Sequence, residues 1–189
     1  TVRARRASPD PVADAWRRLL VGLGYDLRDA HLKDSPARVA RFLSSWHTIV
    51  GTLPPRVTTF PNRAPRVDEL VAVGNFRFYS VCAHHGLPFF GEAAVGYVPD
   101  EHLVGLSKFA RVVDYFAHRF QVQERLTHQI ASYLEERVAP HGVAVVLRGE
   151  HLCMSMRGVE RPGHRTITSD LRGVLRKPEA RAELLALLA

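Results

Sequence analysis

Residues 76–98 read FRFYSVCAHHGLPFFGEAAVGYV, and this stretch predicts two strands joined by a turn rich in cysteine and histidine. Aromatic and β-branched residues dominate residues 76–82, which is typical of an extended segment. A second strand is predicted over residues 91–98, where Pro99-Asp100 ends it. Between the two strands, Cys82 and His85 have the Cys-x-x-His spacing that lets both side chains reach one metal ion. The stretch therefore predicts a strand pair with a candidate metal site at one end.

The rest of the chain predicts helices before this pair and both helices and strands after it. Helical spacing of apolar residues, with Asp10-Pro11 and Ser35-Pro36 as start signals, predicts two helices within the first ~60 residues. The expected later elements are a helix capped by Ser107, a helix over 124–138, strands over 142–147 and 152–157 joined by a turn at 148–150, a further strand over 165–169 and a helix over 178–188. This order predicts an α+β fold with an antiparallel sheet. We expect a helical arm and proline-rich connector over residues 1–66 and a second domain over 67–189.

Composition limits the classes of function. The chain has 189 residues, of which 46% are hydrophobic and 24% charged, as in an ordinary globular protein. It has no apolar run of the ~20 residues that a membrane-spanning helix needs, and residues 1–16 lack the apolar stretch of a secretion signal. Two cysteines cannot form a disulfide scaffold, so we expect a cytoplasmic protein with reduced thiols.

The net charge of +7 favours anionic partners, which leaves nucleic acid, a membrane surface and a phosphorylated small molecule as alternatives. Three arginines cluster in the first six residues, but the other basic residues are dispersed and carry no RNA-binding or helix-turn-helix signature. We therefore expect a small anionic substrate, with no nucleic acid and no membrane as partners.

The second cysteine extends the candidate metal site. Cys153 follows His151 by two residues, and strand alternation would place both side chains on one face. Two thiolates and one imidazole leave an open position on a tetrahedral zinc ion, as catalytic zinc sites require. A fourth ligand from His84 or His151 would instead close the site and make it structural. Buried cysteines that bind no metal are a further alternative.

Two other groups of residues suggest how an anionic ligand would be bound. A helix that begins at Ser107 offers free backbone N–H groups, and Lys108 and Arg111 share one of its faces, so they could hold a polyphosphate. The carboxylate of Glu124 could accept the paired N–H donors of a guanine edge. The alternatives are a solvated basic face for the first group and a helix-dipole partner for Glu124.

These groups lie in longer stretches that resemble GTP cyclohydrolase I. The matching stretches are LGYDLRDAHLKDSPARVARF (23–42), SVCAHHGLPFFGEAAVGYVP (80–99), VGLSKFARVV (104–113), QVQERLTHQIA (121–131) and HLCMSMRG (151–158). The resemblance implies the tunnelling fold, an antiparallel sheet with two helices on one face, preceded by a helical arm. It also implies a decameric ring with its sites at subunit interfaces.

The resemblance assigns a role to each matching residue. The implied zinc ligands are Cys82, His85 and Cys153, and the implied acid–base residues are His84 and His151. The implied guanine anchor is Glu124 with the backbone around Gln123. The residues implied to hold ribose and triphosphate are Ser107, Lys108, Arg111 and Arg157, with Arg38 and Arg41 supplied by a neighbouring subunit.

The resemblance also implies the reaction, in which zinc-dependent hydrolysis of GTP at C8 of guanine releases formate and forms 7,8-dihydroneopterin triphosphate. One position departs from the family pattern, since Ala83 stands where the family has glutamate, in Cys-Ala-His-His. The loss of this carboxylate beside a metal ligand motivates an alternative function. The chain would then act on another guanine derivative or stop at the ring-opened formamide.

Overall fold

The computed structural model describes residues 10–47 and 51–188, which divide into one unit up to Gly51 and a second unit from Thr52. The first unit holds helices α1 (Pro11–Gly22) and α2 (Ser35–Trp46). The Asp10 carboxylate accepts hydrogen bonds from the backbone N–H groups of Val12 and Ala13, at 2.9 and 3.3 Å, so the predicted start signal is confirmed. The apolar residues whose spacing predicts the second helix include Ile49 and Val50, and these two lie outside the described residues.

The second unit is built on a five-stranded sheet in the order β5-β2-β3-β6-β7. Its strands are β2 (Val71–Cys82), β3 (Pro88–Val98), β5 (Phe120–Gln121), β6 (Gly142–His151) and β7 (Thr166–Gly173). All neighbouring strands are antiparallel except β2 and β5. The proline-rich connector lies in this unit, where β1 (Thr59–Pro61) pairs with β4 (His102–Val104).

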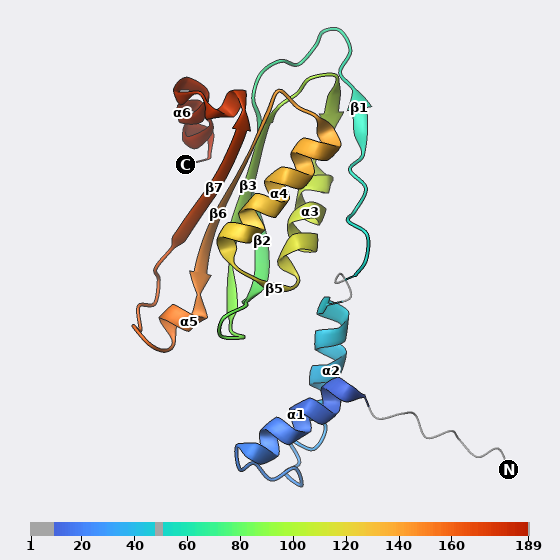
Figure 1. The fold of residues 1–189 in the computed structure, drawn as a ribbon, viewed down its shortest axis with the longest axis vertical. Coiled ribbons are helices and arrows are strands. Elements are labelled where there is room, and N and C mark those ends of the chain that lie inside the picture. The colour runs from blue at the N-terminus through green and yellow to red at the C-terminus, as the bar shows by residue number, and fades with distance from the viewer. Residues whose placement is uncertain (1–9, 48–50, 189) are drawn as a thin grey trace, which may run out of the picture. The chain divides into compact units, whose positions relative to one another are not determined.

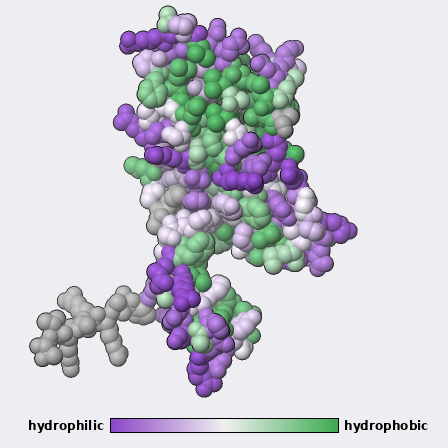
Figure 2. Space-filling model, turned by 180° about the vertical axis from the view of Figure 1, so that it is seen from behind, coloured by the Kyte–Doolittle hydropathy of each residue, from purple (hydrophilic) through white to green (hydrophobic). Residues whose placement is uncertain are grey.

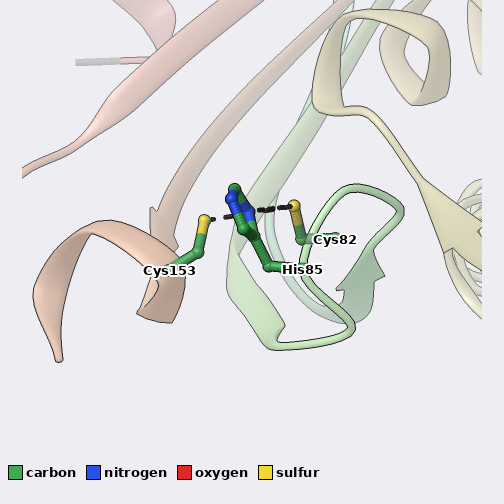
Figure 3. A group of neighbouring side chains, drawn as sticks. All are labelled: Cys82, His85 and Cys153. Atoms are coloured by element: carbon green, nitrogen blue, oxygen red, sulfur yellow. Dashed lines mark hydrogen bonds between the residues drawn. The ribbon is translucent and has the colours of Figure 1, made fainter. Parts of the chain in front are cut away.

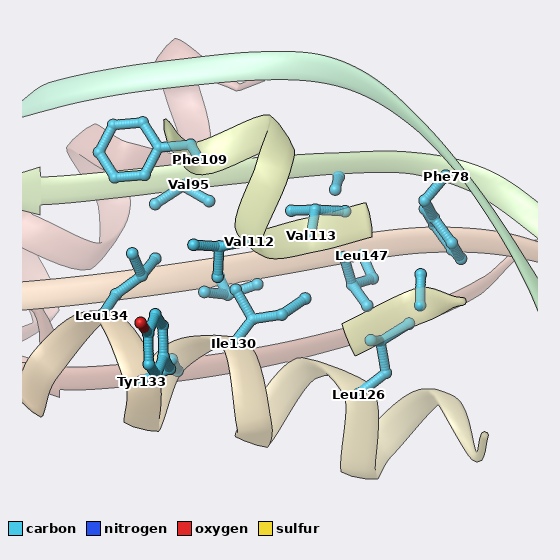
Figure 4. Close-up of a cluster of buried hydrophobic side chains, with 14 of the residues drawn as sticks. Phe78, Val95, Phe109, Val112, Val113, Leu126, Ile130, Tyr133, Leu134 and Leu147 are labelled. Atoms are coloured by element: carbon cyan, nitrogen blue, oxygen red, sulfur yellow. The ribbon is translucent and has the colours of Figure 1, made fainter. Parts of the chain in front are cut away.

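Helices α3 (Ser107–Ala117) and α4 (Gln123–Val138) cover one face of the sheet (Figure 1). Strand alternation explains this arrangement, because alternate residues of β3 and β6, such as Val95, Tyr97 and Val145, are apolar and buried in the core beneath the helices. The resulting core contains Phe89, Val95 and Tyr97 of β3, Val145 and Leu147 of β6, Val112 and Val113 of α3, and Leu126, Ile130 and Leu134 of α4, several of which are drawn in Figure 4. The predicted α+β fold with two helices on one sheet face is confirmed.

The opposite face of the sheet is partly covered by α6 (Pro178–Leu187), whose Leu184 packs with Ala144 and Leu175. Further along the same face, the register places Arg77, Glu92 and Arg148 side by side on three strands. Seen from behind, Figure 2 shows hydrophobic side chains over the upper part of the second unit and a band of hydrophilic side chains below them. None of the helices in the described part of the chain is long and apolar enough to cross a membrane.

Two predictions about local structure are wrong. The expected turn at 148–150 is part of β6, because these residues continue to pair with Glu92, Gly91 and Phe90 of β3. The pairing there is so close that a Cβ on Gly91 would lie 1.9 Å from the Arg148 carbonyl oxygen. The expected strand over 152–157 is instead a short helix, α5 (Leu152–Ser155), since the β3 ladder ends where Phe89 pairs with His151.

The expected cap at Ser107 is wrong, because Ser107 is the first residue of α3 and Leu106 occupies the N-cap position, where it makes no side-chain capping hydrogen bond. The chain enters this helix through a tight turn, in which the Lys108 N–H donates to the Gly105 carbonyl at 2.8 Å.

Candidate metal centre and adjoining pocket

The structure brings together Cys82, His85 and Cys153, whose ligand atoms all lie within 4.8 Å of one another. The Cys82 Sγ is 3.7 Å from His85 Nδ1 and 4.0 Å from Cys153 Sγ. Figure 3 shows the three side chains converging from the end of β2, the turn that follows it and α5. Residues 71 positions apart therefore form one cluster of soft ligands.

The turn after β2 positions two of these ligands. The Cys82 N–H donates to the Leu87 carbonyl at 2.8 Å, and the Gly86 N–H donates to the Cys82 carbonyl at 2.9 Å. Gly86 has a φ of 66°, a left-handed conformation that glycine adopts without a steric penalty. This tight turn directs His85 back toward the thiol of Cys82.

The short helix α5 positions the third ligand. Sequence analysis placed Cys153 on a strand face with His151, but the backbone leaves the sheet after His151. The coil of α5 turns the Cys153 thiol toward Cys82, while His151 stays on the sheet and stacks on Phe89 with ring centroids 4.5 Å apart.

The chemistry of this donor set fits a zinc ion. Burial and the adjacent Cys82 thiol raise the pKa of Cys153, with a smaller opposing effect from Arg157. Zinc binds thiolate and imidazole ligands, and it stabilises the ionised form of the cysteines that it binds. Among the described residues, no other histidine, cysteine, aspartate or glutamate joins the cluster. A zinc ion held by these three protein ligands would have its fourth coordination position open for water, as in catalytic zinc sites.

A pocket of about 290 Å³ adjoins the cluster. It is lined by Cys82, His84, His85, Gln121, Val122, Gln123, Glu124, His151, Cys153, Met154 and Thr166. The pocket lies where the ends of β2 and β6 meet the start of α4, so the sheet and the first turn of this helix together shape it.

Two histidines in the pocket have different surroundings. His84 is exposed, and its Nδ1 lies 3.9 Å from the Cys82 thiol. His151 is half-buried, and its Nε2 lies 2.9 Å from the side-chain oxygen of Gln123. Burial lowers the pKa of His151, His164 lowers it further, and the nearby Glu124 carboxylate opposes both effects. The His151 side chain is engaged with Gln123 and is not part of the metal cluster.

The predicted substrate-binding residues do not all lie at this pocket. Glu124 is exposed and lines the pocket. Arg157 follows α5, and its positive charge is near enough to lower the pKa of Cys153. Ser107, Lys108 and Arg111 occupy the first turns of α3, whose other end leads into β5 beside Cys82. Since α3 has 11 residues, about 16 Å of helix separates its start from the metal end of the sheet.

The remaining predicted residues, Arg38 and Arg41, lie on α2 in the first unit and are described with that unit alone. Arg38 lies 3.7 Å from Asp34, one turn earlier on the same side of the helix.

Several residues of the pocket, including Gln121, Met154 and Thr166, were not predicted from the sequence. The Gln123 side chain also had no predicted role, yet it is fully buried and reaches across to β7. Thr166 lies 43 positions from Gln123, and no spacing rule links the two. A glutamine at a helix start carries no signal that its side chain will turn inward.

Comparison with known proteins agrees with this geometry. A family model described as GTP cyclohydrolase I matches residues 12–189. The GTP cyclohydrolase 1 of Gloeobacter violaceus is 45% identical over 186 residues, which cover 98% of this chain and 87% of that protein. The GTP cyclohydrolase 1 of Aquifex aeolicus is 45% identical over 184 residues, which cover 95% and 96%. A solved structure of apo archaeosine synthase QueF-Like is 18% identical with a TM-score of 0.44, covering 55% of this chain and 93% of that one. A family match over nearly the whole chain, together with 45% identity to both enzymes, shows that the chain belongs to the GTP cyclohydrolase I family.

Proposed function

We propose that this enzyme hydrolyses GTP at C8 of guanine in a zinc-dependent reaction, releasing formate and forming 7,8-dihydroneopterin triphosphate. The observation that carries the proposal is the cluster of Cys82, His85 and Cys153 opening onto a pocket with acid–base and guanine-binding groups. Membership of the GTP cyclohydrolase I family supports the substrate and the reaction class.

The cluster would hold the zinc ion, which when bound lowers the pKa of a water molecule toward neutrality and so supplies the nucleophile for hydrolysis. His84 is suited to donate a proton to N7 of guanine as water adds at C8, because it lines the pocket directly beside the ligand His85. A second water then cleaves the C8 formamide to release formate. Rearrangement of the ribose and ring closure, with loss of one water, complete the pterin.

The other pocket residues bind and orient the substrate in this proposal. The Glu124 carboxylate accepts the N–H donors of the guanine edge, since it is exposed at the pocket wall and carries no salt bridge within the described part of the chain. His151 exchanges protons with the substrate in the later steps, and its half-buried ring keeps it from bulk water.

The triphosphate would be held partly by a second copy of the chain. Ser107, Lys108 and Arg111 lie at the far end of α3 from the metal cluster, so we propose that they serve the pocket of a neighbouring subunit. Arg157 would act within its own subunit, and Arg38 and Arg41 would come from a neighbour. This arrangement requires self-association, and we propose a decameric ring in the cytoplasm with no nucleic-acid or membrane partner. Sedimentation of the purified protein tests the ring, since a monomer would lack these arginines at its pocket.

Ala83 supports one alternative function. Ala83 is exposed between Cys82 and His84, and its backbone N–H donates to the Gln121 carbonyl at 2.9 Å. A pocket without this carboxylate could accept another guanine derivative or stop at the formamide. Mass spectrometry of the products from GTP separates the two functions, and Ala83→Glu tests whether the residue decides between them.

The first experiment follows pterin absorbance and formate when zinc-loaded protein is incubated with GTP. We expect equal amounts of both products. Cys153→Ser should lose bound zinc and turnover, because it removes one of three ligands. Met156→Ser is the matched control, since Met156 is 61% exposed near the same short helix and lies outside the metal cluster. Full turnover by metal-free Cys153→Ser would overturn the proposal.

A further inference from the structure

The side chain of Gln123 occupies a buried polar niche between α4 and the sheet. It is only 1% exposed, although it is the first residue of α4. Its Nε2 lies 2.9 Å from the Thr166 carbonyl, 3.1 Å from the Thr168 hydroxyl and 3.4 Å from the Leu147 carbonyl. Because carbonyl oxygens only accept hydrogen bonds, the amide nitrogen must face β6 and β7. A flipped amide would set its oxygen against two carbonyl oxygens, so the orientation of Gln123 is determined.

This orientation directs the other end of the amide at His151. The Gln123 Oε1 is 2.9 Å from His151 Nε2, and an amide oxygen only accepts. His151 must therefore donate from Nε2, which makes the neutral ring the Nε2–H tautomer with Nδ1 unprotonated. Phe89 stacks on the same ring with an interplanar angle of 2°, which restrains the plane of the imidazole.

We propose that Gln123 is a positioning residue that holds His151 as the Nε2–H tautomer and leaves Nδ1 as the nitrogen that exchanges a proton with substrate. The proposal rests on the proposed function for the proton exchange, but the hydrogen bond and the tautomer stand apart from it. It gives the Gln123 side chain a role distinct from guanine binding by the nearby backbone. Orientation of a catalytic imidazole by a second polar group is a general requirement of acid–base catalysis.

Nitrogen-15 NMR of histidine-labelled, zinc-loaded protein tests the tautomer directly. The chain has 10 histidines, so the His151 signals are assigned by their loss in His151→Gln. At a pH where the ring is neutral, we expect a protonated Nε2 and an unprotonated Nδ1 in the wild-type protein. An Nδ1–H tautomer in the wild type would overturn the proposal without any variant.

Three variants then separate positioning from a merely structural role. Gln123→Leu removes the acceptor and should lose the single tautomer. Gln123→Glu keeps an acceptor toward His151, with a carboxyl proton in place of the amide N–H toward the Thr166 carbonyl, and should retain it. Gln121→Leu is the matched control, because Gln121 is an equally buried pocket glutamine whose amide bonds to Phe116 and Gln129 and not to His151. This control should leave the His151 tautomer unchanged.

Kinetics give the second readout. In Gln123→Leu, kcat should fall about 10- to 100-fold, with KM changed less than about threefold, because proton transfer is lost while the backbone that binds guanine remains. An unchanged kcat in this variant would contradict the proposal. A wild-type protein with the Nε2–H tautomer and no turnover of GTP would overturn the proposed function and leave the positioning by Gln123 supported.

Discussion

His84 and His85 are adjacent and both exposed, yet only His85 belongs to the metal cluster. The tight turn at Gly86 separates their roles, because it directs His85 toward both thiols. His84 reaches the pocket from the neighbouring position and stays available for proton transfer. One residue step along the backbone therefore distinguishes the proposed metal ligand His85 from the proposed acid His84.

This separation predicts different outcomes for two identical substitutions. His85→Gln should lose zinc, measured by plasma mass spectrometry of dialysed protein, because it removes a ligand. His84→Gln should keep zinc and lose about 10²- to 10⁴-fold in kcat, the usual contribution of a general acid. Loss of zinc in His84→Gln would instead identify His84 as a fourth ligand and support the closed structural site.

At the scale of elements, α4 links the core to the pocket. Its apolar side, with Leu126, Ile130 and Leu134, is fully buried against the sheet, and its first turn supplies Gln123 and Glu124 to the pocket. The packing of the helix therefore sets the position of the pocket wall.

Truncation in this core should cost stability. Ile130 is 0% exposed, so Ile130→Ala should lower the free energy of unfolding by about 2–5 kcal/mol through lost burial and a residual cavity. Ile167→Ala on β7 is the matched control, because Ile167 is 62% exposed and should change stability by less than about 0.5 kcal/mol. Urea denaturation measures both, and equal losses would contradict this account of the core.

A network of ion pairs connects α4 to β7. Arg172 donates to both carboxylate oxygens of Asp170, at 3.0 and 2.9 Å, and to Glu135 of α4 at 2.7 Å. The Arg172 side chain is only 15% exposed and that of Asp170 only 18%, so this pair is shielded from solvent, whereas the Glu135 side chain is 49% exposed. The hydrogen bonds from Arg172 hold the pKa of Asp170 below its usual value, with burial opposing them.

This shift predicts a pH dependence of stability. Because the folded state lowers the carboxyl pKa, the stabilisation is complete above the unfolded value of 3.8 and is lost as the pH falls below it. Asp170→Asn should therefore reduce stability near pH 7 by about 1–3 kcal/mol, and the difference from wild type should shrink in acid. Thermal melts from neutral pH down to about pH 3 measure this, and a constant difference would refute the linkage.

For the whole molecule, the net charge of +7 matches an anionic substrate. Lys108, Arg111 and Arg157 would contribute most directly, and exposed charges of this kind are screened by salt. The KM for GTP should therefore rise several-fold between about 0.05 and 0.5 M KCl while kcat changes little. A KM that is independent of salt would argue against a basic triphosphate site.

Much of this protein could be predicted from its sequence alone. The start of α1, the strands around Cys82 and the presence of helices α3 and α4 follow from local signals, namely caps, apolar periodicity and turn residues. The placement of both helices on one face of the sheet was expected only from the resemblance to GTP cyclohydrolase I. The two cysteines and the spacing of Cys82 and His85 pointed to a metal site, but they left open a fourth ligand from a neighbouring histidine. The set of three ligands was expected from the family resemblance, and the structure brings these three residues together.

Only the tertiary structure decided how these parts meet. β6 runs through Arg148-Gly149-Glu150 because β3 continues to pair with it, and α5 begins where that pairing ends, which places Cys153 at Cys82. The bond between Gln123 and His151 depends on carbonyl groups of two other strands. Such contacts join residues far apart in sequence, so no local pattern encodes them, and they form only when the sheet and α4 have packed together.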